Sequence, residues 1–161
     1  MSLGSFPIDL VSCTDEELVA VWFHANTELH RRGAKLWHAG DLAEILVATA
    51  IGGTRAKSNV QRGYDLFGPE GARWQVKALV TRPGNTRTSV GFLTPGSYDV
   101  LAIVLFAEDM ANVQAWRMPP DVVSDYGKWH PDRGQYRLTR TRKLTNDSRV
   151  EPLALELPHP L

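Results

Sequence analysis

The stretch GYDLFGPEGARWQVKAL, residues 63–79, carries most of the information about the fold. Two short apolar runs flank the turn Gly-Pro-Glu-Gly, which is the pattern of a β-hairpin. We expect its strands over Tyr64–Phe67 and Arg73–Val80. Both strands also carry charged or amide side chains at positions where a sheet normally places apolar ones. The hairpin is therefore predicted to carry chemistry as well as to build the sheet.

Three polar side chains of this hairpin are predicted to meet. Gln75 and Lys77 are two residues apart on one strand, so their side chains point to the same face. Asp65 lies on the other strand, and pairing across the turn can bring it close to both. The sequence thus predicts a cluster of oxygen ligands beside one ammonium group. Mg²⁺ takes oxygen ligands of this kind.

The rest of the chain reads as helices first and strands afterwards. The motif Thr14-Asp15-Glu16-Glu17 has the form of a capping box and predicts a helix start. A near-continuous apolar run over Tyr98–Phe106 predicts a central strand covered on both faces. The other predicted elements are helices over Asp15–Arg32, Ala39–Ile51 and Val122–Tyr126, strands over Val113–Met118 and Gln135–Thr141, loops over 54–62 and 81–88, and a mobile Pro-rich tail.

Length and composition predict one domain. The chain has 161 residues, of which 43% are hydrophobic and 22% charged, as is usual for a globular protein with a real core. We expect a single α/β domain over residues 1–161, with a central mixed sheet of about four to five strands flanked by helices. Its core is predicted over about 39–118, with an N-terminal helix over 15–32 and a basic C-terminal hairpin and tail over 133–161.

The cellular compartment is predicted from what the sequence contains. Cys13 is the single cysteine, which fits a reducing compartment. No apolar run is long enough to span a membrane, and no basic-then-apolar leader is visible. We therefore expect a cytoplasmic protein without a membrane partner.

The hairpin resembles the signature of the PD-(D/E)XK nuclease superfamily, the restriction-endonuclease-like phosphodiesterases. In that signature an Asp ends one strand, and an acidic residue, any residue and a Lys follow on the next. Asp65 matches the first position, and Gln75-Val76-Lys77 matches the second in a QxK form. Tyr64 stands in the place of the Pro. The resemblance covers roughly residues 39–118 and implies a restriction-endonuclease-like core.

The resemblance also implies roles for the site residues. Asp65, the Gln75 side chain and the backbone carbonyl of Val76 would hold Mg²⁺ or Mn²⁺, and Lys77 would activate the attacking water. Glu44 fits the acidic position that the superfamily often places on the preceding helix. Its neighbours on that helix are apolar, so a buried Glu44 would need a metal or a hydrogen-bonding partner. Because Gln75 is neutral, metal binding is expected to be weaker than with an acidic residue.

Basic residues provide candidate phosphate contacts, although the formal net charge of the chain is zero. The expected partner is DNA, double-stranded in preference, with RNA as an alternative. Since the chain has no evident recognition domain, a homodimer would bring two sites to two strands, or a partner protein would supply specificity. The predicted nucleic-acid-binding residues are Arg55, Lys57, Arg62, Arg137, Arg140 and Arg142.

Two other functions compete with a metal-dependent endonuclease that hydrolyses DNA. A nuclease fold that has lost catalysis would bind DNA or a protein, and the neutral Gln75 makes this alternative credible. A structural or interaction protein with an unrelated sheet would use neither Asp65 nor Glu44 to bind a metal. The five histidines show no zinc spacing.

Overall fold

The computed structural model describes residues 9–31, 39–56, 63–81, 89–108 and 112–157. The chain divides into two compact units, one formed by Met1–Trp37 with Pro158–Leu161 and the other by His38–Leu157. All of the strands that the structure describes lie in the second unit. The single domain over residues 1–161 stays a prediction.

The first unit contains helix α1, Asp15–Arg31. The Thr14 amide donates to Glu17 Oε2 at 2.8 Å, and the Glu17 amide donates to Thr14 Oγ1 at 3.3 Å. These two bonds satisfy amide groups that a helix start leaves without intrahelical partners. The predicted capping box and helix start are thereby confirmed.

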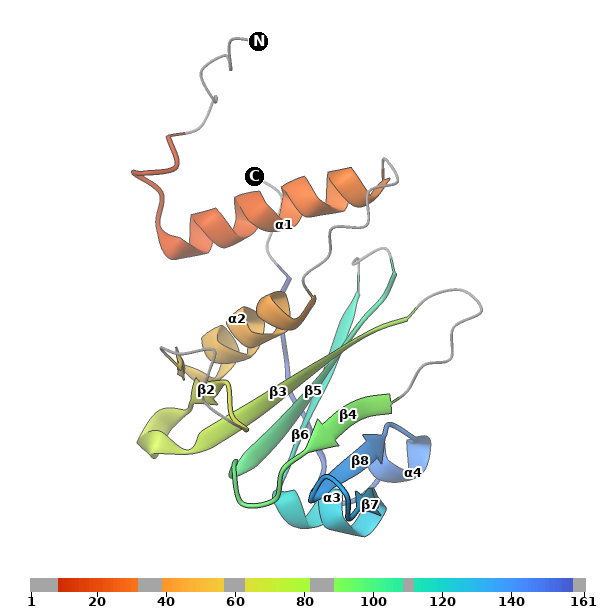
Figure 1. Ribbon diagram of the computed structural model, residues 1–161. Coiled ribbons are helices and arrows are strands. Elements are labelled where there is room, and N and C mark those ends of the chain that lie inside the picture. The colour runs from red at the N-terminus through yellow and green to blue at the C-terminus, as the bar shows by residue number, and fades with distance from the viewer. Residues whose placement is uncertain (1–8, 32–38, 57–62, 82–88, 109–111, 158–161) are drawn as a thin grey trace. The chain divides into compact units, whose positions relative to one another are not determined.

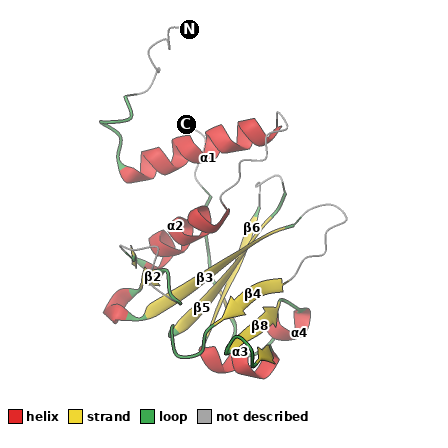
Figure 2. Cartoon of the chain, in the orientation of Figure 1, coloured by secondary structure: helices red, strands yellow, loops and turns green. Residues whose placement is uncertain are grey.

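The second unit is built on a mixed six-stranded sheet with the strand order β1-β2-β3-β5-β6-β9 (Figures 1 and 2). The central strand β5 runs parallel to β3 and antiparallel to β6. The sheet is therefore mixed and lies in an α/β unit, as predicted. Its strands are β1 (Thr54–Arg55), β2 (Leu66–Phe67), β3 (Arg73–Val80), β5 (Val100–Phe106), β6 (Val113–Met118) and β9 (Glu151–Pro152).

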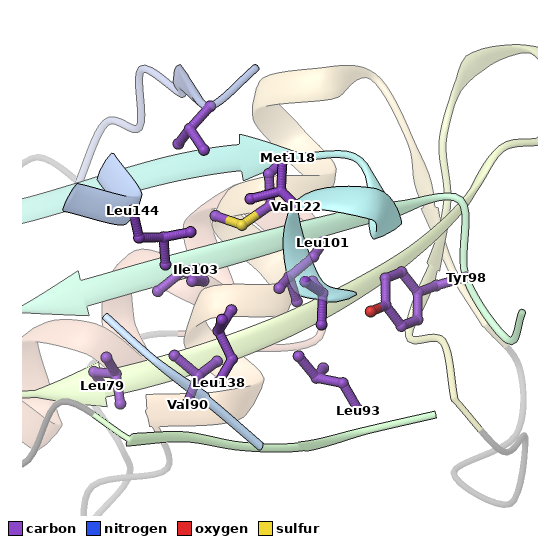
Figure 3. Close-up of a cluster of buried hydrophobic side chains, with 12 residues drawn as sticks. Leu79, Val90, Leu93, Tyr98, Leu101, Ile103, Met118, Val122, Leu138 and Leu144 are labelled. Carbon is purple, nitrogen blue, oxygen red and sulfur yellow. The ribbon is translucent and has the colours of Figure 1, made fainter. Parts of the chain in front are cut away.

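Strand β5 confirms the prediction of a strand covered on both faces. Leu101, Ala102, Ile103 and Val104 are four consecutive residues with no exposed surface. Successive side chains of a strand point to opposite faces, so burial of all four requires a packed layer on each side. Leu101 and Ile103 belong to the core cluster that also includes residues of the second sheet described below (Figure 3).

Helix α2, Ala39–Ile51, has the predicted bounds and packs on β3. Its residues Leu42, Ala43 and Val47 have no exposed surface, which explains the nearly uniform apolar sequence of this helix. Figure 1 shows α2 on one side of β3 and β5, with the second sheet and the short helices α3 (Pro120–Tyr126) and α4 (Arg142–Thr145) on the other.

A second sheet, which the sequence analysis did not predict, has three antiparallel strands in the order β4-β8-β7. Its strands are β4 (Ser89–Leu93), β8 (Gln135–Thr139) and β7 (Lys128–His130). Alternation over Gln135–Thr141 indicated a strand of the exposed kind, which is wrong in part, because β8 is the middle strand of this sheet and Leu138 is fully buried. Leu93 and Leu138 pack into the cluster with Leu101 and Ile103 (Figure 3).

The C-terminal segment is also more ordered than predicted. Glu151 and Pro152 form β9, which pairs with Arg117 and Trp116 of β6, and Arg117 forms an ion pair with Glu151. The expectation of a mobile tail is therefore wrong for residues 151–153, where the Leu153 amide also donates to the Ala115 carbonyl. The expected four to five strands become six because β1 and β9 add one short strand at each edge. No helix within the described ranges is long and apolar enough to cross a membrane.

Candidate active site

The predicted hairpin forms, but its first strand is shorter than expected. β2 pairs antiparallel with β3 at only two positions, Leu66 with Trp74 and Phe67 with Arg73. The connecting turn contains a 3-10 helix over Pro69–Gly71. Before Leu66 the chain leaves the ladder, after one last backbone bond in which the Asp65 amide donates to the Trp74 carbonyl at 2.7 Å. The two strands therefore separate at Asp65.

The Asp65 carboxylate replaces the missing strand partner. Asp65 Oδ2 accepts the Val76 amide at 2.7 Å and Gln75 Nε2 at 2.5 Å. A carboxylate oxygen thus takes the place of a backbone carbonyl where the β2–β3 ladder ends. The same oxygen accepts a hydrogen bond from the buried side-chain amide of Gln75. The predicted proximity of Asp65 and Gln75 is confirmed, whereas their catalytic and metal-binding roles stay predictions.

The carbonyl of Val76 points to the edge of β3 beside which β2 has ended. Backbone groups of alternate residues in a strand point to the same edge, and the Trp74 carbonyl points to β2. The Val76 amide and carbonyl therefore also face the β2 side, where β2 has ended. Gln75 Nε2 lies 3.4 Å from this carbonyl. We call the end of β2 beside β3, with Asp65, Gln75 and Val76 around it and Lys77 next along β3, the β2–β3 notch.

Lys77 completes the notch from β3. Its register partner on β5 is Ile103, and the partner of Gln75 is Leu101, so Lys77 and Gln75 share the face that carries this part of the core. Lys77 is only half-buried, and its charge lowers the pKa of Asp65. The Lys77 ammonium group thus favours the ionised form of the Asp65 carboxylate, while its predicted role in activating water stays a prediction.

Glu44 approaches from α2, which covers the opposite face of the sheet. Its partner is Arg55, whose Nη2 lies 2.8 Å from Glu44 Oε2 and whose Nε lies 3.1 Å from the same atom. Arg55 Nη2 also lies 3.3 Å from Asp41 Oδ1. The partner that a partly buried Glu44 was expected to need is therefore an arginine. The negative charge of Asp65 also raises the pKa of the Glu44 carboxyl, although burial raises it more.

Arg55 joins the site through β1, a strand that lies in a predicted loop. β1 pairs with β2 so that Arg55 faces Leu66, and the Ala56 amide donates to the Asp65 carbonyl at 2.9 Å. Only the antiparallel pairing brings Arg55 beside Glu44. The two-residue strand has no periodic pattern of its own, so no local signal in the sequence could have found it.

The loop that leads to Asp65 is held by the β4–β5 connection. Ser97 Oγ donates to the Gly63 carbonyl at 3.2 Å, and Gly63 has φ +97°. A Cβ at residue 63 would lie 2.1 Å from Ser97 Oγ, so only glycine fits this close approach. This contact fixes the path of the chain two residues before Asp65.

Both carboxyl groups of the site have raised pKa values. Burial raises the pKa of Asp65, and the Val76 amide and the charges of Lys77 and Arg55 offset part of that rise. Burial also raises the pKa of Glu44, with Arg55 acting against it and the charge of Asp65 adding to it. Each acid is thus disfavoured in its ionised form by the folded structure.

This electrostatic cost leads to a prediction for Glu44→Gln in the absence of metal. The stability linked to the raised pKa of Glu44 is fully present below its ordinary value of 4.5 and is lost as the pH rises through the raised value. The variant should therefore match the wild type at acidic pH. Near neutral pH it should be more stable, by less than about 1 kcal/mol because Glu44 is only partly buried. Urea unfolding at both pH values, with EDTA present, measures the difference.

The control for this prediction is Glu156→Gln, because Glu156 is exposed and makes no contact with the site. This control should change stability little at either pH. A Glu44→Gln protein that is less stable than the wild type near neutral pH would show that the ion pair with Arg55 outweighs the cost of burial.

The predicted phosphate-contacting residues are spread over the second unit. Arg55 lies in the site, and Lys57 and Arg62 fall outside the described residues. Arg137 lies on β8 and donates to Ser89 Oγ at 3.2 Å, Arg140 lies over the ring of Trp116, and Arg142 is exposed on α4. The structure thus brings Arg55 to the notch and places the other three near the second sheet or the short helices.

The donor set of the notch suits a single hard cation. Asp65 Oδ1 and Glu44 Oε1 accept no hydrogen bond within the described residues, so each carboxylate keeps one oxygen for a ligand. No three His, Cys, Asp or Glu side chains of the described chain converge on a common point. The third and fourth oxygen ligands would be the Val76 carbonyl and the Gln75 amide, as the QxK form implies; the amide, whose Nε2 faces Asp65 and Val76, would turn its oxygen toward the cation.

A cavity of about 400 Å³ lies apart from these groups. It is lined in part by Trp74, Asp99 and Met118, and none of the notch side chains contributes to it. The cations at its rim, Arg117 and Arg149, are in ion pairs with carboxylates. We therefore place the candidate site at the notch, where Asp65 Oδ1 accepts no hydrogen bond from a residue that the structure describes.

No protein-family model matches the sequence, and none of the curated proteins compared with it matches either.

Proposed function

We propose that the second unit is a metal-dependent phosphodiesterase that hydrolyses DNA, with a restriction-endonuclease-like core. The observation that carries the proposal is the pairing of Asp65 Oδ2 with Gln75 Nε2 at 2.5 Å and with the Val76 amide at 2.7 Å. One carboxylate thereby gathers an amide side chain and a strand edge, and Lys77 lies on the same face as that amide.

The arrangement of elements supports the same proposal. Helix α2 packs against β3, the β2–β3 hairpin carries the acidic and QxK positions, and β5 and β6 continue the mixed sheet. A helix before the Asp strand can then supply Glu44. One fold can have many functions, so the side chains in the notch support the proposal more strongly than the arrangement of elements does.

Each side chain has a definite task in this mechanism. Asp65 and Glu44 would hold Mg²⁺ or Mn²⁺ with their free oxygens, together with the Gln75 and Val76 carbonyls. The bound cation would lower the pKa of its water and stabilise charge on the phosphate. Lys77 orients and activates the attacking water, and its positive charge stabilises the negative charge that develops on the scissile phosphate.

Arg55 tunes the charge of this site. Arg55 is hydrogen-bonded to one oxygen of Glu44, and its charge lowers the pKa of Asp65. It thereby offsets part of the cost of ionising the two carboxylates when no metal is bound. The formal charges of Arg55 and Lys77 balance those of Asp65 and Glu44, and Asp41, the second acid paired with Arg55, is exposed to solvent. Together with the neutral Gln75, this balance supports a weak site for one metal and not a tight site for two.

The experiment is nicking of supercoiled plasmid DNA in Mg²⁺ or Mn²⁺. Replacing Lys77 by Met removes the group that activates water and should slow nicking by about 10²- to 10⁴-fold, the usual contribution of a general acid or base. Lys143→Met is the matched control, because Lys143 lies on α4 above the Tyr126 ring. This control should nick at the wild-type rate.

Under this proposal the wild type nicks plasmid DNA, and the Lys77→Met variant nicks it far more slowly. Equal nicking by the two proteins would mean that Lys77 has no part in catalysis. Absence of wild-type nicking with every divalent metal would refute the enzyme proposal as a whole.

A nuclease-like unit without catalysis is the second candidate. The Gln75 amide donates to Asp65, and Arg55 is bonded to Glu44, so both acids already have positive or donor partners without a metal. Such a unit would bind DNA and leave it intact. Oligonucleotide binding in the absence of nicking distinguishes it from the enzyme.

The product would also report on assembly. A single notch cuts one strand, whereas a homodimer would set two notches on two strands and release linear plasmid. A partner protein that supplies specificity would leave the isolated chain with slow, sequence-independent nicking. RNA substrates tested in parallel would show whether DNA is preferred.

A further inference from the structure

The sheet β4-β8-β7 has one buried face and one face turned away from the core. Leu93 and Leu138 point into the core cluster (Figure 3). Arg137 alternates with Leu138 on β8, and its register partners are Phe92 on β4 and Lys128 on β7. These side chains therefore share the opposite face. We call this surface the outer face and define it by Phe92, Lys128, Arg133 and Arg137.

The outer face is positively charged without compensation. Lys128 and Arg137 are both exposed and lie directly opposite each other on paired strands. Like charges at such positions destabilise a sheet. Neither of them forms an ion pair with any residue that the structure describes, and the three strands contain no acidic residue. Asp132 is the only acidic residue between Lys128 and Lys143 in the sequence.

Several other arginines of the second unit are paired with carboxylates, although Arg142 on α4 is exposed and forms no ion pair with a described residue. Arg73 is paired with Asp99, Arg117 with Glu151, and Arg149 with three aspartates. Arg133 of the outer face lies 3.8 Å from Asp132, at the limit of an ion pair. The chain has zero formal net charge, so the unpaired cations on this sheet are a local accumulation and not the result of an overall excess.

The aromatic ring of this face is already covered. The Arg133 guanidinium lies over the Phe92 ring, 4.5 Å from its centroid, and His130 meets the same ring edge-on at 5.2 Å. A nucleobase would need an open ring on which to stack. The face instead offers charged donors, which suit the phosphates of a duplex whose bases are paired.

We propose that the outer face binds the phosphate backbone of double-stranded DNA, independently of sequence. Lys128, Arg133 and Arg137 supply the charge, and the stacking of Arg133 on Phe92 holds its guanidinium outward. The choice of DNA over RNA rests on the proposed function; the binding of a duplex polyanion to this face does not. This surface adds Lys128 and Arg133 to the contacts expected from the sequence.

The test is fluorescence anisotropy of a labelled DNA duplex at several salt concentrations, with EDTA present so that cleavage cannot contribute. The double variant Lys128→Gln with Arg137→Gln should bind about 10- to 100-fold more weakly than the wild type. Its salt dependence, log Kd against log salt, should be shallower by about 2, since each lost phosphate contact lowers that slope by about 0.9. Arg133→Gln should lose about 3- to 10-fold.

The matched control is Arg31→Gln with Arg117→Gln, which removes the same net charge from paired arginines outside the outer face. This control should keep the wild-type slope. Equal loss in both double variants would refute the proposal, because net charge alone would then explain binding. An RNA duplex bound more tightly than the DNA duplex would overturn the choice of DNA. Binding to anionic phosphatidylserine vesicles is measured for the same variants. If the outer-face double variant loses vesicle binding but keeps DNA binding, the outer face is a lipid-binding surface and the proposal is wrong. Because EDTA removes metal from this binding assay, its result does not depend on whether the protein nicks plasmid DNA.

Discussion

Replacing Asp65 by Asn is expected to slow metal-dependent nicking by about 10³-fold or more, because the charge that would hold the cation and its water is lost. The same change should remove the rise in thermal midpoint that Mn²⁺ gives the wild type. The fold should survive, since an Asn carbonyl oxygen in the place of Oδ2 can still accept both the Val76 amide and Gln75 Nε2. Nicking under single-turnover conditions and a thermal shift with Mn²⁺ measure the two effects.

The stability of this variant without metal is an internal check. Burial raises the pKa of Asp65, so ionised Asp65 costs stability near neutral pH, and the Asp65→Asn variant should be at least as stable as the wild type.

Asp99→Asn is the matched control for the nicking assay, because Asp99 is an exposed carboxylate paired with Arg73. It should change nicking by less than about threefold, as expected for a surface ion pair. A Mn²⁺ shift that persists in Asp65→Asn would favour an unrelated fold that binds metal elsewhere.

Replacing Gln75 by Glu should make the stability of the protein depend on metal. Gln75 is 9% exposed and its Nε2 lies 2.5 Å from Asp65 Oδ2, so a carboxylate there would face a second carboxylate in a buried place. We expect a loss of about 2–3 kcal/mol in the free energy of unfolding near neutral pH without metal. Saturating Mn²⁺ should recover most of this loss, because the added charge strengthens the site for a cation.

The pH dependence of this variant separates charge from packing. Two carboxylates that share a site keep one proton between them, so acidification should also restore stability. Urea unfolding with EDTA, with Mn²⁺ and at acidic pH gives the three values. Gln114→Glu on the exposed part of β6 is the matched control and should be insensitive to metal. Unchanged stability of Gln75→Glu without metal would show that the notch is open to water and would weaken the proposed site.

Several elements could be predicted from the sequence because their signals are local. The capping box of α1 and the bounds of α2 depend on residues a few positions apart, and both are present in the structure. The uninterrupted apolar run of β5 also reports directly on burial of both faces. The spacing of Asp65 and Gln75 around a tight turn was sufficient to predict their contact.

Other elements depend on partners that are distant in the chain. β4 pairs with β8 across more than forty residues, and Ser89–Leu93 contains a glycine that weakens its strand pattern. β9 consists of two residues that become a strand only because the edge of β6 is open to them. Short segments of this kind have no periodicity, so neither strand was predicted.

The sequence by itself determined that an acid, an amide and an ammonium group lie around one hairpin, because a strand period of two and a tight turn leave few other arrangements. Tertiary structure alone decided what surrounds them. The pairing of β1 with β2 placed Arg55 on Glu44, and the end of β2 turned Asp65 into the partner of the Val76 amide. The second sheet likewise collected Lys128 and Arg137 on one face. Long-range pairing sets these contacts, and its free energy comes from burying whole layers and not from any local pattern.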